Sequence, residues 1–347
     1  MRIAIVGRPW IEVPPPGHGG VERVCATLIA ELIRRGHDVT LIGVGRDGTQ
    51  ATFHATYSEP QMHHGVSLIP ELAHAARARR LLAEGSFDIV HDHTLIGPLL
   101  GRVGGTPVLS TVHDPVLGYE TSEKYTLLGD YYDALGPDAN LVAVSRAQRA
   151  ARPGLNWVDT VHNGIDVDSL PFNGSDRDGF VLWLARFIPG KAPDLAIRAA
   201  REAGLPLVLA GRLGAQERPY FDEVVRPLLG DGVELIANPG QDEAMGLLSR
   251  ACCLLHPVRF AEPFGMVLAE AAACGTPVVG MNRGAVAEVV ADGVTGWICD
   301  DPADLAAALH RAGEIDPVVC RDRAVRNFSA GAMAHGYERL YRAVAEL

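Results

Sequence analysis

Short runs of β-branched residues alternate with longer alanine- and leucine-rich segments along almost the whole chain. The first run, 3–6, precedes a segment in which Val24, Leu28 and Leu32 recur every four residues, as on one face of a helix. A second run, 39–44, follows. Strand, helix and strand in this order form a βαβ unit with parallel strands. The pattern therefore predicts an α/β protein with parallel sheets covered by helices on both faces.

The same alternation predicts where the other elements lie. The predicted strands are 3–6, 39–44, 89–91, 108–111, 141–144, 181–184, 207–210, 233–236, 253–256, 278–280 and 297–299. The predicted helices are 21–35, 70–84, 193–203, 243–249, 265–274, 303–312 and 328–347. The densest cluster of turn-forming and charged residues lies between Asn163 and Gly179, and such clusters separate domains. We expect two Rossmann-like, doubly wound domains, 1–168 and 169–327, with a ligand cleft between them near the C-terminal strand ends.

The net charge of −11 at pH 7 weighs against nucleic-acid binding, which needs clustered excess lysine and arginine. Arg77, Arg79 and Arg80 form a local exception on the predicted helix 70–84. The favoured interpretation of this run is a solvated helix face. The alternative is peripheral contact with a membrane surface or an acceptor.

The sequence contains neither an apparent targeting segment nor a cysteine motif. No apolar run reaches the roughly eighteen residues that a membrane-spanning helix needs. The N-terminal segment reads as a strand of the fold rather than a signal peptide, because it lacks a long apolar region and a cleavage site. The six cysteines show no CxxC pair and no zinc-site spacing, and Cys252-Cys253 lies in an apolar stretch typical of a buried strand. We therefore expect a cytoplasmic protein without a disulfide framework.

The strongest chemical signal is a pair of glutamates, Glu262 and Glu270, separated by just over two helical turns. Pro263 suits the start of a helix, so Glu262 is expected on the preceding loop and Glu270 on the second turn. The backbone N–H groups between the glutamates would face outward at the positive end of the helix dipole; they belong to Phe264, Gly265, Met266 and Val267. An anion site flanked by carboxylates that accept hydrogen bonds from hydroxyls fits a nucleotide sugar. Either glutamate alone could equally be a surface residue beside a core helix.

Two further loops carry weaker signals. Arg186 and Lys191 follow a predicted strand, and a guanidinium fork with a mobile ammonium suits a pyrophosphate. Gly19 and Gly20 lie between the first strand and the first helix, where the missing Cβ atoms let a ligand approach the backbone. They do not form a GxGxxG fingerprint, so a dinucleotide site is weakly indicated. Taken singly, the basic pair could be solvated and the glycines a tight turn.

The histidines need separate interpretation. His91 and His93 lie two apart on a predicted strand, and with Asp92 they could suggest a metal site. No third ligand is indicated, so a polar pair at a strand end is favoured and no metal site is expected. Among the histidines, His113 is the candidate for a functional role.

Taken together, these features resemble the retaining glycosyltransferases of family 4, which have the GT-B fold of two facing Rossmann-like domains. The resemblance covers nearly the whole chain. Its motifs are the Pro-then-Gly-Gly-x-Glu loop at 14–22, 87–93 (FDIVHDH), 110–113 (STVH), 142–145 (VAVS), 162–166 (HNGID), the Arg186/Lys191 loop, 209–211 (LAG), the Glu-x7-Glu motif and 273–279 (ACGTPVV). Ala185 departs from the glycine often found before the arginine, and the compact chain lacks a long acceptor-binding insertion.

This resemblance implies roles for the nucleotide-binding residues. Arg186 and Lys191 would hold the donor phosphates and stabilise the leaving diphosphate. Glu270 would bind the ribose hydroxyls, while Glu262 and the amides of 264–267 would hold the hexose. The base contacts would be largely backbone, around 238–241.

The resemblance also implies roles for the first domain. Gly19 and Gly20 would close over the donor, and His113 would line the reaction centre. The family has no agreed protein nucleophile; the acceptor is described as attacking the face that the diphosphate leaves, with a phosphate oxygen taking its proton. The C-terminal helix, 328–347, would cross back to the first domain. The predicted activity is retaining transfer of a hexose from a nucleotide diphosphate sugar, a UDP-sugar or GDP-mannose, to an unidentified acceptor.

Neither a cofactor nor a metal is expected, because the pyrophosphate site has a basic pair and no Asp-x-Asp pair. The main rival function is a sugar-nucleotide epimerase, which also uses two Rossmann-like domains and binds a similar donor without an acceptor. A non-catalytic sugar-nucleotide-binding protein is a second rival, against which the complete set of carboxylates and basic residues weighs. A dehydrogenase is a more distant third.

Overall fold

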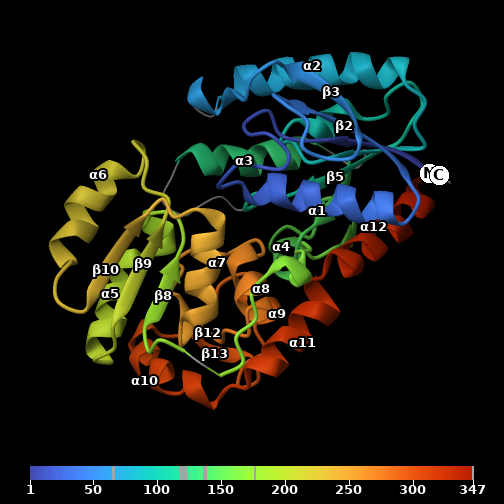
Figure 1. Ribbon diagram of the computed structural model, residues 1–347. Helices are drawn as coiled ribbons and strands as arrows, with labels where there is room; N and C mark the ends of the chain where they lie inside the picture. The colour runs from blue at the N-terminus through green and yellow to red at the C-terminus, as the bar shows by residue number, and fades with distance from the viewer. Residues whose placement is uncertain (65–66, 117–122, 136–138, 176, 346–347) are drawn as a thin grey trace. The chain divides into compact units, whose positions relative to one another are not determined.

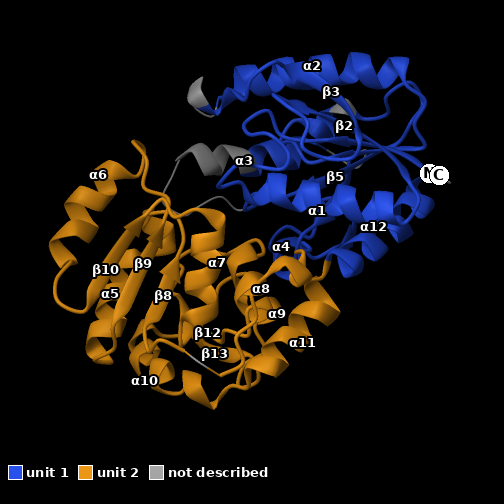
Figure 2. Ribbon diagram, in the orientation of Figure 1, with its two compact units in different colours: residues 1–164, 330–347 blue, residues 165–329 orange. Residues whose placement is uncertain are grey.

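The computed structural model describes residues 1–64, 67–116, 123–135, 139–175 and 177–345. It divides into two compact units (Figure 2). Unit 1 comprises Met1–Gly164 and Ala330–Leu347, and unit 2 comprises Ile165–Ser329. Within the described ranges, no helix is both long and apolar enough to cross a membrane.

Unit 1 contains a seven-stranded sheet with the order β3-β2-β1-β4-β5-β6-β7, in which all the strand pairs are parallel (Figure 1). Its strands are β1 (Arg2–Val6), β2 (Asp38–Val44), β3 (Thr52–Tyr57), β4 (Ile89–Asp92), β5 (Val108–Val112), β6 (Asn140–Ala143) and β7 (Trp157–Thr160). Its α-helices are α1 (Gly20–Arg34), α2 (Leu68–Glu84), α3 (Glu123–Ala134), α4 (Arg146–Ala151) and α12 (Ala330–Ala345). The central strands are almost fully buried because helices cover both faces of the sheet.

Helix α12 returns to unit 1 and packs beside α1 (Figure 1). Its buried side chains include Met333, Tyr337 and Tyr341. The Tyr341 hydroxyl lies 2.7 Å from His91 Nδ1, and His91 Nε2 lies 2.7 Å from Thr111 Oγ1. Apolar packing and buried hydrogen bonds thus join the last helix to β4 and β5.

Unit 2 contains a six-stranded parallel sheet with the order β10-β9-β8-β11-β12-β13. Its strands are β8 (Val181–Leu184), β9 (Leu207–Gly211), β10 (Val233–Ala237), β11 (Cys253–His256), β12 (Val278–Met281) and β13 (Gly296–Cys299). Its α-helices are α5 (Pro193–Glu202), α6 (Arg218–Tyr220), α7 (Gln241–Arg250), α8 (Met266–Ala273), α9 (Val286–Val289), α10 (Leu305–His310) and α11 (Pro317–Phe328). A π-helical turn, Phe221–Val225, follows α6. In the core of unit 2, the Phe187 ring packs against Trp183 in a tilted arrangement and against Phe221 edge to face.

The strand order places a topological switch point in each sheet. In unit 1 the chain proceeds outward from β1 to β3 and then returns to β4 on the other side of β1. In unit 2 it proceeds from β8 to β10 and returns to β11 in the same way. Ligands of doubly wound sheets bind at the carboxyl ends of the strands at such a point. The fold class predicted from the sequence, α/β with two doubly wound parallel sheets, is confirmed.

Some elements differ from the prediction. The strands β3 and β7 and the helices α3, α4, α9 and α11 were not predicted. Both strands lie at sheet edges, and β3 is largely exposed, so it needs no continuous apolar run. Helix α8 begins at Met266 rather than at Pro263, because Gly265 adopts a left-handed conformation (φ 81°) at the position before the helix.

Candidate active site

In unit 2, the loop after β8 presents Lys191 on a tightly fixed turn. The Lys191 N–H donates to the Ile188 carbonyl (3.0 Å), and its own carbonyl accepts from the Trp183 indole (2.9 Å). The Lys191 ammonium lies 4.9 Å from the centre of the Phe260 ring. Ala192 follows in a left-handed conformation (φ 51°), which is costly for a residue with a Cβ atom. Strain of this kind is often found at functional sites.

The loop after β11 places Glu262 opposite this lysine. Glu262 is buried, and its backbone pairs with the segment after β12, where the Ala285 N–H donates to the Glu262 carbonyl (2.8 Å). Gly284 makes this approach possible, since a Cβ atom there would lie 2.4 Å from the Glu262 carbonyl oxygen. The backbone of Glu262 is thereby fixed independently of its side chain.

Half-buried Lys191 and buried Glu262 and His256 form a cluster of ionisable side chains. The Lys191 ammonium donates to Glu262 Oε2, and His256 Nε2 lies 3.3 Å from the same oxygen, without the geometry of a hydrogen bond. Burial raises the pKa of Glu262, but Lys191 and His256 overcome that effect and lower it to about 2. Burial lowers the pKa of His256. Glu262 is therefore an ionised carboxylate at physiological pH, beside a neutral imidazole.

The N-terminus of α8 follows this cluster directly. The N–H groups of Met266 and Val267, the first two residues of α8, have no acceptor within their own helix. Phe264 is buried against Phe328, with ring centres 5.7 Å apart, so its contribution at the helix end can come only from its backbone. Glu270 is buried on the second turn of α8.

The structure brings Lys191 and Glu262 together but does not join Arg186 to them. Arg186 is exposed just after the end of β8 and makes no ion pair among the described residues. Asn238, in the region expected to contact the base, makes hydrogen bonds within unit 2. Its Oδ1 accepts from the Leu213 N–H (2.9 Å), and its N–H donates to the Gly211 carbonyl (2.8 Å), which ties together the loops after β9 and β10.

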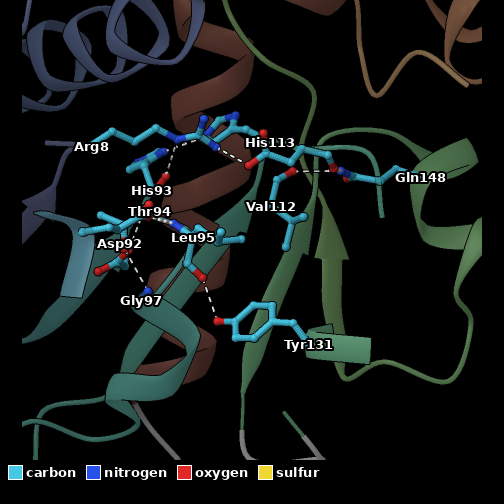
Figure 3. A network of polar contacts seen from close by, with 12 residues as sticks. Arg8, Asp92, His93, Thr94, Leu95, Gly97, Val112, His113, Tyr131 and Gln148 are labelled. Carbon is cyan, nitrogen blue, oxygen red and sulfur yellow. Dashed lines mark hydrogen bonds and ion pairs between the residues drawn. The ribbon is translucent and has the colours of Figure 1, made fainter. Parts of the chain in front are cut away.

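In unit 1, His113 pairs with His93 at the carboxyl ends of β4 and β5 (Figure 3). His93 Nδ1 lies 2.9 Å from His113 Nε2, and the rings are stacked with centres 5.2 Å apart. Burial, together with Arg8, lowers the pKa of His93 to about 3; burial and His93 lower that of His113. Both rings are therefore neutral at physiological pH, with one donating to the other.

Arg8 follows β1 and links the two sides of the switch point of unit 1. Its Nε donates to the His93 carbonyl (3.2 Å) and its Nη2 to Asp114 Oδ2 (2.6 Å). Gln148 of α4 holds the same loop, because its Nε2 donates to the carbonyls of Val112 (2.9 Å) and Asp114 (3.0 Å) (Figure 3). The two chain neighbours of His113, Val112 and Asp114, are thus both fixed by hydrogen bonds.

Asp92, beside His93, is a buried acid with a strongly perturbed pKa. Its Oδ1 accepts from the backbone and hydroxyl of Thr94 (both 2.7 Å), while its Oδ2 is buried with no hydrogen-bond partner among the described residues. Burial raises the pKa of Asp92 to about 6. The folded state therefore keeps the Asp92 proton at pH values where the unfolded state has already released it. The free energy of unfolding consequently falls as the pH rises from about 4 to about 6.

We expect Asp92→Asn, which keeps the Oδ1 acceptor without the charge, to be more stable than the wild type above pH 6. The advantage should approach about 3 kcal/mol and shrink towards pH 4, since one pKa unit corresponds to about 1.4 kcal/mol. Urea unfolding at pH 4.5 and pH 7.5 measures this difference. Asp88→Asn, at a half-exposed ion pair with Arg2, is the control. Parallel pH dependences for wild type and Asp92→Asn would contradict the assignment.

Gly19 and Gly20 lie at the N-terminus of α1, on the loop after β1. A Cβ atom at Gly19 would come within 2.8 Å of Pro15 and 2.9 Å of the Glu22 carboxylate, whereas one at Gly20 would meet nothing within 4 Å. Local packing alone therefore requires glycine at Gly19 but not at Gly20.

Sequence reasoning missed three contributors to these clusters: Arg8, His93 and His256. Each stands at or just after the end of a strand beside a switch point. A polar residue at a strand end was the available sequence signal for a site residue. It identifies the site only once the strand order shows which strand ends are neighbours. Among the described residues, no group of three or more His, Cys, Asp or Glu side chains is placed to hold a metal ion. His91 bonds to Tyr341 and Thr111, and His93 pairs with His113.

Comparison with known proteins shows where this architecture occurs. A family model described as glycosyl transferases group 1 matches residues 170–319, and one described as glycosyltransferase family 4 matches residues 18–169. Glycogen synthase of Mycobacterium tuberculosis is 28% identical over 374 residues, covering 93% of this chain and 88% of that protein. D-inositol 3-phosphate glycosyltransferase of Mycolicibacterium smegmatis is 28% identical over 299 residues, covering 76% of this chain and 68% of that protein.

A solved structure extends the similarity to the whole fold. The crystal structure of AviGT4, a glycosyltransferase involved in avilamycin A biosynthesis, matches with a TM-score of 0.76 and 28% identity, covering 99% of this chain and 98% of that one. Both halves of the chain thus match glycosyltransferase models, and both sheets have the corresponding doubly wound topology. The chain therefore belongs to the group 1 and family 4 glycosyltransferases, enzymes of the GT-B fold that transfer a sugar from a nucleotide sugar.

Proposed function

We propose that this enzyme transfers a hexose from a nucleotide diphosphate sugar with retention of anomeric configuration and without a metal ion. The observation that carries the proposal is the ion pair between half-buried Lys191 and buried Glu262 at the switch point of unit 2, directly before the N-terminus of α8. A positive charge for a diphosphate, a carboxylate for sugar hydroxyls and backbone N–H groups for an anion are brought together there by the fold.

The proposed chemistry assigns each group to one part of the donor. Lys191 and Arg186 hold the diphosphate, Glu262 and the amides of Met266 and Val267 hold the hexose, and Glu270 holds the ribose. Only Oε2 of Glu262 is engaged by the described residues, which leaves Oε1 to accept from a sugar hydroxyl.

In the transfer step, the bond between the anomeric carbon and the phosphate oxygen breaks as the acceptor oxygen attacks from the same face. The diphosphate keeps the bonding electrons, and one of its oxygens takes the acceptor proton. The developing negative charge faces Lys191, so the catalysis is mainly electrostatic. No protein nucleophile or general base is required on this route.

In unit 1, we propose that His113 acts beside the donor sugar. Its neutral imidazole, paired with His93, can donate a hydrogen bond to a sugar hydroxyl or accept one from it, depending on the tautomer, without introducing a charge. Gly19 and Gly20 are proposed as backbone contacts to the donor.

Binding and turnover assays test this function. Thermal shift is measured with UDP-glucose, GDP-mannose and dTDP-glucose, since a ligand of the folded state raises its melting temperature. Release of UDP, GDP or dTDP is then followed with water as the acceptor, and the anomeric configuration of the first sugar product is read by NMR. Incubation with donor alone separates the functions, because an epimerase would yield an epimerised sugar nucleotide.

Metal independence predicts that EDTA leaves nucleotide release unchanged. The physical reason is that Lys191 supplies the positive charge that a divalent cation would otherwise place at the diphosphate. The assay compares enzyme treated with excess EDTA with the same enzyme supplied with Mg²⁺ or Mn²⁺. Loss of activity that only a metal ion restores would overturn this part of the proposal.

A further inference from the structure

Arg259 lies on the loop between β11 and Glu262 and contacts the turn that carries Lys191. Its guanidinium Nη1 donates to the Pro189 carbonyl (3.0 Å), and its backbone N–H donates to the Gly190 carbonyl (2.9 Å). Pro189 and Gly190 are the two residues immediately before Lys191. One arginine thus fixes the entry to the turn through two separate donors.

The same guanidinium also fixes the exit from the turn. It forks Asp194, with Nη1 2.8 Å from Oδ1 and Nη2 2.6 Å from Oδ2. Asp194 is buried in the first turn of α5, and it accepts a further hydrogen bond from the Tyr220 hydroxyl (3.0 Å). Lys191 therefore lies in the chain between Pro189 and Asp194, both of which bond to the Arg259 guanidinium.

The turn needs such support because of its conformation. Ala192 is buried with φ 51° and ψ 52°, a left-handed conformation that is unfavourable for an L-residue with a Cβ atom. The Pro189 carbonyl, to which Arg259 donates, is also the acceptor for the Ala192 N–H (3.1 Å). Arg259 bonds to the very carbonyl that closes the strained turn.

The chain position of Arg259 connects this turn to the other half of the charged cluster. Arg259 precedes Glu262 by three residues, and Glu262 is the partner of Lys191. Its contacts therefore join the loop after β8 to the loop after β11, on the two sides of the switch point.

We propose that Arg259 is a positioning residue that sets the location of the Lys191 ammonium through Pro189 and Asp194. This inference rests on the proposed role of Lys191 at the leaving diphosphate. The Arg259 side chain is 45% exposed. Its partner Asp194 is buried, so loss of this ion pair should lower stability as well as change the geometry of the turn and hence turnover. A misplacement of about 1 Å at a catalytic group can cost roughly a hundredfold in rate.

The test is Arg259→Gln, which removes the fork, assayed by nucleotide release from whichever of UDP-glucose, GDP-mannose or dTDP-glucose raises the melting temperature. We expect kcat to fall roughly tenfold to a hundredfold, with a lower melting temperature because the buried Asp194 carboxylate loses its partner. Arg250→Gln is the matched control, because Arg250 forms a half-exposed pair with Asp178 in the same unit, on the strand-start side of β8. It should retain wild-type kcat. Asp194→Asn should lower kcat in the same direction by weakening the same fork.

The decisive measurement places Arg259→Gln in a Lys191→Ala background. If Arg259 acts through Lys191, its substitution should then change kcat less than twofold. An undiminished loss in that background would overturn the positioning role, and so would wild-type kcat for Arg259→Gln when Lys191→Ala is impaired. Full turnover by Lys191→Ala alone would instead overturn the proposed function of Lys191. If Arg259→Gln does not fold, Asp194→Asn is carried through the same cycle with the same criteria.

Discussion

Replacing Lys191 with alanine is expected to lower kcat by on the order of a hundredfold or more. The Lys191 ammonium would face negative charge that grows as the sugar–phosphate bond breaks. Such an interaction is stronger in the transition state than in the ground state, so its loss should appear in kcat rather than only in KM. Nucleotide release at saturating donor measures kcat, and its dependence on donor concentration gives KM.

The control for this substitution concerns the charge left behind. Without Lys191, the buried Glu262 carboxylate would have only the neutral His256 beside it, and a buried charge that loses its partner is destabilising. Melting temperatures are therefore measured for every variant, and Lys191→Arg is included because it keeps the charge. If Lys191→Ala raised KM for the donor and left kcat intact, the assignment to the leaving group would be wrong.

The two glutamates should behave differently from the lysine and from each other. Glu270→Ala is expected mainly to raise KM for the donor, because ribose hydroxyls do not change during the reaction and their binding is uniform. Glu262→Ala should affect both kcat and KM, since it removes a sugar contact and the partner of Lys191. Equal effects of the two substitutions on kcat would contradict this division of roles.

The central part of each sheet was predictable because its strands are buried on both faces. Such strands are continuous apolar runs, and β1, β2, β8 and β11 all followed this rule. The edge strand β3 has polar and exposed residues, so its sequence carries no such run. Helix α11 has an amphipathic sequence with charged residues on its outer face, and its Asp316 cap and Pro317 were available signals that were not used.

Part of the candidate site was indicated by the sequence, but its arrangement was not. Glu262 and Lys191 were identified through their chemistry and motif, yet they are 71 residues apart and their contact depends on the strand order. His256 and Arg8 belong to no local motif; they reach their clusters because parallel strands end at the same edge of the sheet. Long-range pairing of this kind is encoded by the fold and not by spacing along the chain.

His91 illustrates the same limit in another way, because its hydrogen-bond partners could not be predicted from the sequence. His91 bonds to Tyr341, which lies 250 residues further along the chain, and to Thr111 on the neighbouring strand.

Removing α12 by ending the chain at Ser329 is expected to abolish cooperative folding of unit 1. The truncation would expose the apolar surfaces of α1 and the sheet that Met333, Tyr337 and Tyr341 cover. It would also leave His91 Nδ1 without its partner and break the links from Glu338 to Arg35 (2.9 Å) and His37 (2.8 Å).

A finer variant, Tyr341→Phe, keeps the ring but removes the hydroxyl, and an unpaired buried polar group costs about 1–3 kcal/mol. Urea unfolding measures both, with Arg342→Ala, an exposed neighbour on α12, as the control. A truncated protein that melts and turns over like the full chain would show that α12 is dispensable, because unit 1 would then fold without it.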